Sequence, residues 1–147
     1  MPLLTITTER EINARVDRVW SLLTDFPGHA QWNPFIPEIS GDLVQGGKLQ
    51  VLIEPPGKKA MRFKPTLLTV APNQELRWRG VLLMGFFFAG EHFFQLSPIK
   101  GSSTRFIQGE IFSGLLAKVL MNSQLASIEQ GFNAMNLALK ELAESPA

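Results

Sequence analysis

The feature that most constrains this fold is the C-terminal segment, in which no proline occurs between Gly114 and Pro146. A helix predicted over 115–143 would be roughly 40 Å long. It must therefore lie across a whole sheet to bury its apolar side. That side is predicted from large apolar residues that recur three and four positions apart. They are Leu125, Ile128, Phe132, Met135, Leu139 and Leu142.

The remainder of the chain has the pattern of strands separated by turns. Leu4 to Ile12 alternates between two kinds of side chain and is rich in β-branched residues, which indicates a half-buried strand. Asp17 can cap a short helix that ends before Pro27, and a second helical turn is expected over 28–32. Gly, Pro and Asn occupy the turns between the strands that follow. These strands are predicted at 36–43, 48–54, 60–70, 74–81, 86–97 and 104–112.

The order of these elements predicts an α+β fold with one domain over residues 1–147. Strands joined by short turns form an antiparallel sheet, and a single long helix can cover only one face of it. Hydrophobic residues make up 45% of the chain, and eleven Phe and three Trp are present. This surplus of aromatic side chains either fills the core or lines a cavity within it.

Composition argues against several functions. The net charge of +1 and the lack of a basic run give no indication of nucleic-acid binding. The chain has no Cys, and His29 and His92 are far apart, so we expect no metal and no cofactor. The N-terminal residues lack a signal-peptide pattern, so we expect a cytoplasmic protein. The apolar run 81–90 is about half as long as a membrane span.

The last predicted hairpin turns at Gly101, which sets its register. If the pairing is symmetric about Gly101, His92 lies opposite Glu110 on the face that the large Phe residues mark as inward. The same face carries the pairs Phe94 with Gln108, Leu96 with Phe106, and Gly90 with Phe112. In the preceding hairpin, a two-residue turn at 72–73 would pair Thr69 with Leu76 and Leu67 with Trp78. Phe63 has the parity of Leu67, and Phe88 joins the inward set.

A buried imidazole and a buried carboxylate each need a partner, and His92 and Glu110 would satisfy each other. Three interpretations remain open. The pair fills the core, or it is the polar anchor of an apolar ligand pocket, or it is an acid and base in catalysis. His29 and Asn33 are expected to be exposed loop or capping groups.

Six segments, taken in order, carry a resemblance over nearly the whole chain. They are RVWSLLTDF at 18–26, WNPF at 32–35, LRWRG at 76–80, GEHFF at 90–94, EIFSG at 110–114 and MNLALKE at 135–141. Together they resemble the START-like, polyketide cyclase and dehydrase group of helix-grip proteins, the SRPBCC family. One departure is Arg15, where relatives often have proline before the first helix.

The resemblance implies a curved seven-stranded antiparallel sheet that wraps around the long C-terminal helix and encloses a cavity, with two short helices after the first strand. Carried over by position, the family's pocket would use Trp32, Phe35, Trp78, His92, Phe94, Gln108, Glu110, Leu116 and Leu120. The predicted register adds Phe63, Leu67, Phe88, Phe106 and Phe112 to the ligand-binding set.

Three functions remain open from the sequence. The first is binding or transport of a small hydrophobic ligand, lipid-like or aromatic, in the internal cavity. The second is a polyketide cyclase or dehydratase in which Glu110 and His92 move protons, without help from a phenol because the chain has no Tyr. The third is an interaction module in which the apolar hairpin 81–88 contacts a membrane, without spanning it, or another chain, for example in a homodimer.

Overall fold

The computed structural model describes residues 3–81, 85 and 87–146. A five-stranded antiparallel sheet runs in the order β1 (Leu4–Ile12), β8 (Ser103–Ser113), β7 (Ala89–Ile99), β6 (Glu75–Val81) and β5 (Thr66–Ala71). A second sheet has the order β2 (Glu38–Gly41), β3 (Leu49–Ile53) and β4 (Met61–Phe63). The helices are α1 (Val16–Thr24), the 3-10 turn η1 (Phe26–Gly28), α2 (His29–Trp32), α3 (Ala117–Met121) and α4 (Leu125–Glu144).

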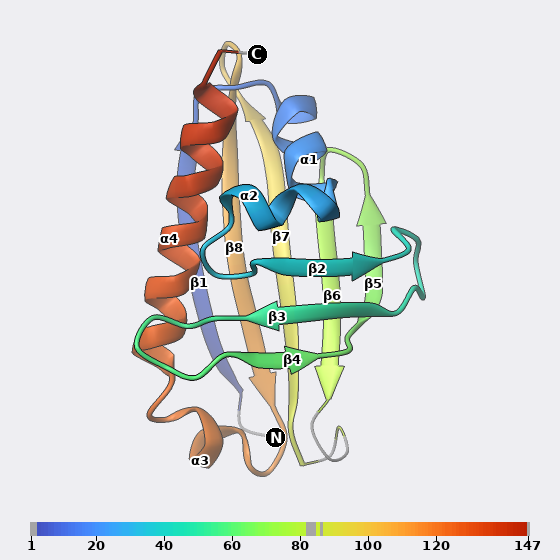
Figure 1. The fold of residues 1–147 in the computed structure, drawn as a ribbon, viewed down its shortest axis with the longest axis vertical. Helices are drawn as coiled ribbons and strands as arrows, with labels where there is room; N and C mark the ends of the chain where they lie inside the picture. The colour runs from blue at the N-terminus through green and yellow to red at the C-terminus, as the bar shows by residue number, and fades with distance from the viewer. Residues whose placement is uncertain (1–2, 82–84, 86, 147) are drawn as a thin grey trace.

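These elements form two layers. In Figure 1 the five long strands lie at the back, and α4, α1, α2 and the small sheet lie in front of them. The small sheet crosses over β6 and β5, while α4 runs along β1 and β8. The core lies between the layers, where α4 contributes Ile128, Phe132, Met135 and Leu139. The predicted helix-grip arrangement of a sheet around a C-terminal helix is confirmed.

The two sheets together have eight strands in the described part of the chain, whereas a single sheet of seven was predicted. The predicted strand 60–70 is divided, because Lys64 and Pro65 separate β4 from β5. Proline has no N–H to donate to a neighbouring strand, so it interrupts a central pairing. As a result β4 pairs with β3, while β5 pairs with β6. Phe63 therefore lies opposite Val51 in the small sheet, and the parity argument from Leu67 does not place it.

The predicted helix over 115–143 is also divided. A turn at 122–124 separates α3 from α4, which has 20 residues and is thus about 30 Å long. No helix in the described residues has the length and hydropathy to cross a bilayer. Gly131 gives α4 its close approach to the segment after α2, because a Cβ at this position would collide with the Phe35 ring. Phe35 instead packs edge-on against Phe132, with the ring centroids 5.3 Å apart.

The predicted register of the last hairpin is confirmed, including the pairs His92 with Glu110 and Phe94 with Gln108. In the hairpin before it, Leu67 pairs with Trp78 as expected, but Thr69 pairs with Arg77 and not with Leu76. The turn is one residue longer than predicted, since Ala71 and Glu75 are the last pair. An irregularity between Leu67 and Thr69 then restores the register at Trp78.

Arg18 joins the start of α1 to the C-terminal end of α4. Arg15, not Asp17, occupies the N-cap of α1, and Asp17 lies in the first turn, where it accepts hydrogen bonds from Arg15 Nε and Arg18 N. The guanidinium of Arg18 donates to the carbonyl oxygens of Ala143 at 2.7 Å and Leu142 at 3.2 Å. It thereby satisfies the Ala143 carbonyl, which the helix C-terminus leaves without an intrahelical partner, and it adds to the Ser145 donors of the Leu142 carbonyl.

Candidate functional site

The inward face of the five-stranded sheet holds a histidine enclosed by aromatic rings. The His92 side chain is fully buried. Its ring centroid lies 4.7 Å from that of Phe94, 4.9 Å from that of Phe132 and 5.1 Å from that of Trp78. A polar ring in such a setting must be hydrogen-bonded to be tolerated.

Its partners form a polar chain that crosses the core, made of Thr8, Asn136, Gln108, His92 and Glu110. Thr8 Oγ1 donates to the Gln108 carbonyl oxygen at 2.8 Å and accepts from Asn136 Nδ2 at 2.8 Å. Asn136 Oδ1 accepts from Gln108 Nε2 at 2.7 Å. Gln108 Oε1 lies 2.9 Å from His92 Nε2. The polar chain thus links β1, α4, β8 and β7.

The directions of these hydrogen bonds are determined by two backbone carbonyls, which can only accept. The Thr8 hydroxyl donates its hydrogen to the Gln108 carbonyl, so it can only accept from Asn136. The amide nitrogen of Asn136 must therefore face Thr8. Gln108 Nε2 also faces the Phe132 carbonyl at 3.4 Å, which fixes the same orientation independently. Gln108 therefore presents its oxygen to His92, and His92 Nε2 carries a hydrogen.

The other ring nitrogen, His92 Nδ1, points toward Glu110. Glu110 Oε1 lies 3.5 Å from it, and Nδ1 is the buried side-chain polar atom without a hydrogen bond among the described residues. Because His92 Nε2 already carries a hydrogen toward Gln108, Nδ1 is the ring nitrogen that remains to interact with Glu110.

Glu110 is the member of the polar chain that solvent or a ligand can reach. Its side chain is 15% exposed, whereas that of His92 is 1% exposed. The carboxylate lies over Gly90 of β7, where a Cβ would be 2.5 Å from Oε2. Gly90 thus leaves the space that Glu110 occupies. The polar chain ends in a carboxylate that lies near the edge of the core.

The structure separates the predicted ligand-binding residues by depth. Those fully enclosed are Phe35, Leu67, Trp78, His92, Phe94, Phe106, Gln108 and Phe112. Those partly buried are Trp32, Phe63, Phe88, Glu110 and Leu116, and Leu120 is exposed. Sequence reasoning missed two members of the polar chain, Thr8 and Asn136. Asn136 had a usable signal, because it is a polar residue on the apolar side of α4.

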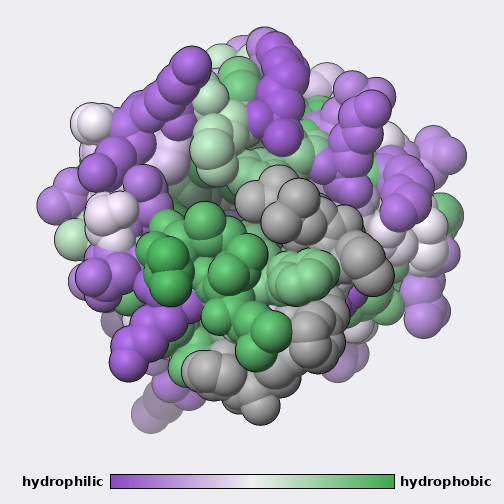
Figure 2. All heavy atoms as spheres, turned by 90° about the horizontal axis from the view of Figure 1, so that it is seen from below, coloured by the Kyte–Doolittle hydropathy of each residue, from purple (hydrophilic) through white to green (hydrophobic). Residues whose placement is uncertain are grey.

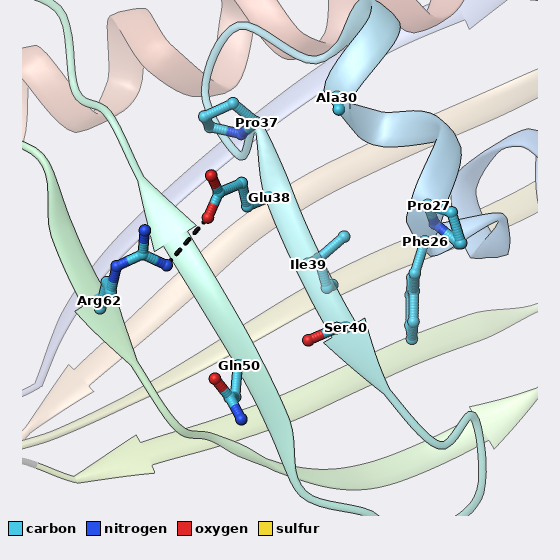
Figure 3. A pocket seen from close by; sticks show the side chains of 9 residues that line it. All are labelled: Phe26, Pro27, Ala30, Pro37, Glu38, Ile39, Ser40, Gln50 and Arg62. Atoms are coloured by element: carbon cyan, nitrogen blue, oxygen red, sulfur yellow. Dashed lines mark hydrogen bonds and ion pairs between the residues drawn. The ribbon is translucent and has the colours of Figure 1, made fainter.

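Two hollows among the described residues do not involve the predicted set. One of about 310 Å³ opens beside η1 and the small sheet, with the ion pair of Arg62 and Glu38 on one side and Phe26 and Pro27 on the other (Figure 3). The other, of about 340 Å³, lies at the start of α1 around Arg18. Neither contains a residue of the polar chain.

Phe88, Leu116 and Leu120 of the predicted set belong to segments that lie toward one end of the molecule. We call this the lower end; it comprises α3, the ends of β6 and β8, and the start of β7, all at the bottom of Figure 1. Figure 2 views the molecule from this side and shows apolar side chains gathered there. Exposed apolar residues of these segments are Val81, Phe87, Leu115, Val119 and Leu120.

The predicted apolar hairpin 81–88 falls partly in this region. Residues 82–84 and 86 lie outside the described residues. Of the others, Val81 and Phe87 are exposed, while Phe88 is partly buried and stacks on Phe112 with the ring centroids 6.1 Å apart. The described part of the hairpin therefore contributes both to the surface and to the edge of the core.

His29 and Asn33 are buried, and the expectation that they are exposed is wrong. His29 Nε2 donates to the Leu23 carbonyl at 2.7 Å, and its Nδ1 accepts from Asn33 Nδ2 at 3.0 Å. Asn33 Oδ1 accepts from the backbone N–H groups of Phe35 and Ile36, so its capping role is as expected. Burial lowers the pKa of His29 and favours its neutral form.

Several solved structures share this fold. An aromatase/cyclase, ZhuI, from Streptomyces sp. R1128 superposes with a TM-score of 0.79 at 14% identity, over 97% of this chain and 94% of its own. Norcoclaurine synthase from Thalictrum flavum gives 0.73 at 16% identity, over 99% and 90%. The hypothetical protein jhp0584 from Helicobacter pylori gives 0.76 at 16% identity, over 96% and 88%. These likenesses establish the fold.

Family membership rests on the sequence itself. No curated protein matches the chain. Residues 4–144, from the start of β1 to the end of α4, match the family described as polyketide cyclase / dehydrase and lipid transport. This match spans both sheets, α4 and every residue of the polar chain. The chain therefore belongs to the polyketide cyclase/dehydrase and lipid transport family.

Proposed function

We propose that this protein binds and carries a small hydrophobic molecule that enters from the lower end and places a polar group against Glu110. The observation that supports this most directly is the position of Glu110. It ends a buried polar chain, yet it remains partly exposed, and it lies on the same face as Phe112. A few polar atoms within apolar walls are the usual composition of a small-molecule site.

The energetics favour a mainly apolar ligand. Removing apolar surface from water contributes about 25 cal/mol per Å², so contact with aromatic walls supplies most of the affinity. A ligand of this kind would reach Glu110 past Phe88 and Leu116, both of which are partly buried. Glu110 supplies orientation, because a polar atom buried against it without a hydrogen bond costs free energy.

Two glycines that face each other on neighbouring strands provide a matched test. Gly80 pairs with Gly90, but a Cβ on Gly80 would meet only Pro65 at 3.8 Å, whereas one on Gly90 would displace the Glu110 carboxylate. Each protein is purified from its native host, extracted with organic solvent, and the extract is analysed by mass spectrometry. The wild type and Gly80→Ala should release the same small hydrophobic molecule, and Gly90→Ala should release much less.

Two results would contradict the proposal. One is the recovery of no hydrophobic molecule from the wild type. The other is equal recovery from Gly80→Ala and Gly90→Ala, since binding of the ligand would then not depend on the position of Glu110. Circular dichroism of both variants establishes that the comparison is made between folded proteins.

A second candidate is catalysis of polyketide cyclisation or dehydration, favoured by the contact between His92 Nδ1 and Glu110 Oε1. A carboxyl group and an imidazole that share a proton can deliver it to a ligand oxygen and take it back, which is general acid and base catalysis. Glu110→Gln should then abolish turnover of a polyketide-like substrate while leaving its binding intact. Unchanged turnover in Glu110→Gln would exclude this role.

The lower end also favours contact with a membrane, from which a carrier could load. The stretches 80–90 and 111–128 contain a single charged residue, Lys118. Val119, beside it, is 76% exposed. Val44 is 56% exposed in the loop after β2, away from α3, and serves as the control. Vesicles with anionic lipid should carry the wild type and Val44→Ser in a flotation assay, and Val119→Ser should float less.

A homodimer through the same surface predicts a different result. In that case gel filtration with light scattering would give a dimer that Val119→Ser dissociates, and none of the three proteins would float with vesicles.

A further inference from the structure

We infer that the site selects hydrophobic molecules that carry a hydrogen-bond donor, such as a hydroxyl group, over equally apolar molecules that carry only acceptors. This inference rests on the proposed function and specifies the chemical class of its ligand. It follows from the direction of the hydrogen bonds in the polar chain, which begins at the backbone carbonyls of Gln108 and Phe132.

The first step concerns His92. The carbonyls of Gln108 and Phe132 orient the side chains of Thr8, Asn136 and Gln108, so that Gln108 Oε1 accepts from His92 Nε2. The hydrogen on Nε2 is therefore donated to Gln108, away from Glu110. Only Nδ1 remains to interact with Glu110, at 3.5 Å from Oε1.

The second step concerns the two oxygens of Glu110. Oε1 is the oxygen that faces the imidazole, 3.5 Å from His92 Nδ1, and the other oxygen, Oε2, is left as an acceptor because a carboxylate oxygen offers only lone pairs. Oε2 is the atom that lies over Gly90, beside the Phe112 ring.

The third step concerns the ligand. A hydroxyl group placed at Oε2 donates a hydrogen bond to it. An ether or carbonyl oxygen in the same place cannot form a hydrogen bond, because both atoms are acceptors. A hydrogen bond to a charged group and the avoidance of a buried unpaired acceptor together change binding by an amount that corresponds to at least about tenfold in affinity. Gln108, Asn136 and Thr8 act in this selection as positioning residues, since they set the hydrogen on His92.

The test uses three probes of similar size: 2-naphthol, 2-methoxynaphthalene and 2-naphthoate, titrated into the protein by calorimetry. The wild type should bind 2-naphthol about tenfold or more tightly than either of the others. Glu110→Gln should keep this preference, because its amide nitrogen can donate to His92 Nδ1 and its oxygen then replaces Oε2. Glu110→Leu should bind 2-naphthol and 2-methoxynaphthalene equally.

The outcomes separate the inference from the function on which it rests. Equal binding of 2-naphthol and 2-methoxynaphthalene by the wild type would overturn the donor selection and leave the hydrophobic site standing. Binding of none of the probes would contradict the proposed site itself. Loss of the preference in Glu110→Gln would show that charge, not hydrogen-bond direction, decides.

A spectroscopic measurement tests the first step without any ligand. The chain has two histidines, and His29 Nε2 must carry a hydrogen because it faces the Leu23 carbonyl, so His29 is an internal reference. Long-range correlation of ring carbon-bound hydrogens with ring ¹⁵N should show a hydrogen on Nε2 of both rings. A His92 ring with its hydrogen on Nδ1 and none on Nε2 would overturn the inference, and Gln108→Leu should weaken the constraint on His92 alone.

Discussion

Replacing Thr8 by valine tests whether the polar chain is a connected structure. Valine has nearly the same shape as threonine, but it lacks the hydroxyl that donates to the Gln108 carbonyl and accepts from Asn136 Nδ2. Asn136 and Thr8 are both buried, so water cannot replace the lost partner. A buried group left without its hydrogen bond costs about 1–3 kcal/mol, and we expect Thr8→Val to lower the free energy of unfolding by that amount.

The neighbouring Thr7 is the matched control, because it is exposed on the opposite face of β1. Thr7→Val should change the free energy of unfolding by less than about 0.5 kcal/mol. Urea unfolding of both variants, followed by circular dichroism and Trp fluorescence, measures the difference at constant m-value.

A double-mutant cycle with Asn136→Leu extends the argument from one residue to the network. Asn136→Leu alone leaves Gln108 Nε2 with the Phe132 carbonyl at 3.4 Å as its remaining partner. Each single variant already breaks the hydrogen bond between Thr8 and Asn136. The double variant should therefore lose less free energy of unfolding than the sum of the two single losses, by about 1 kcal/mol or more. Strict additivity of the two changes would refute the connected chain, as would a Thr8→Val variant no less stable than Thr7→Val.

Three further predictions concern other contacts. Gly131→Ala should lower stability by about 1–3 kcal/mol in urea unfolding although alanine favours helices, because its Cβ would collide with Phe35; a gain in stability would contradict this packing. Arg18→Met should lower the free energy of unfolding by about 1–2 kcal/mol, since the Ala143 carbonyl at the end of α4 loses its donor, and equal stability would show that water replaces the guanidinium. Burial lowers the pKa of His29 below 6.5 in the folded protein. His29 is therefore protonated at a higher pH in the unfolded chain than in the folded chain, and stability should fall as the pH falls below about 6.5. Urea unfolding at a series of pH values measures this loss, which should be smaller in His29→Gln; an unchanged loss would remove His29 as its source.

Much of the site follows from local rules that act over a few residues. The hairpin at Gly101 has a short turn, and side chains alternate strictly along a strand, so the register that places His92 beside Glu110 could be worked out from the sequence. The same rule gave one wrong pair in the hairpin before it, because the turn after Ala71 is longer by one residue and its register depends on an irregularity at Thr69.

Other parts of the site depend on contacts between residues far apart in the chain. Thr8 and Asn136 are separated by 128 positions, and nothing in either local pattern indicates that their side chains meet. The break between α3 and α4 likewise depends on how the segments pack, whereas the division of strand 60–70 has a local cause in Pro65.

By itself, the sequence determined an α+β chain whose C-terminal helix lies on an antiparallel sheet, and a His92 that faces Glu110 among aromatic residues. These follow from periodicity and turn length, which are properties of neighbouring residues. Only the tertiary structure decided that His29 is buried and that His92 Nε2 carries its hydrogen toward Gln108. The reason is that a hydrogen bond has a direction, and this direction is set at carbonyl groups that packing brings to the far end of the polar chain.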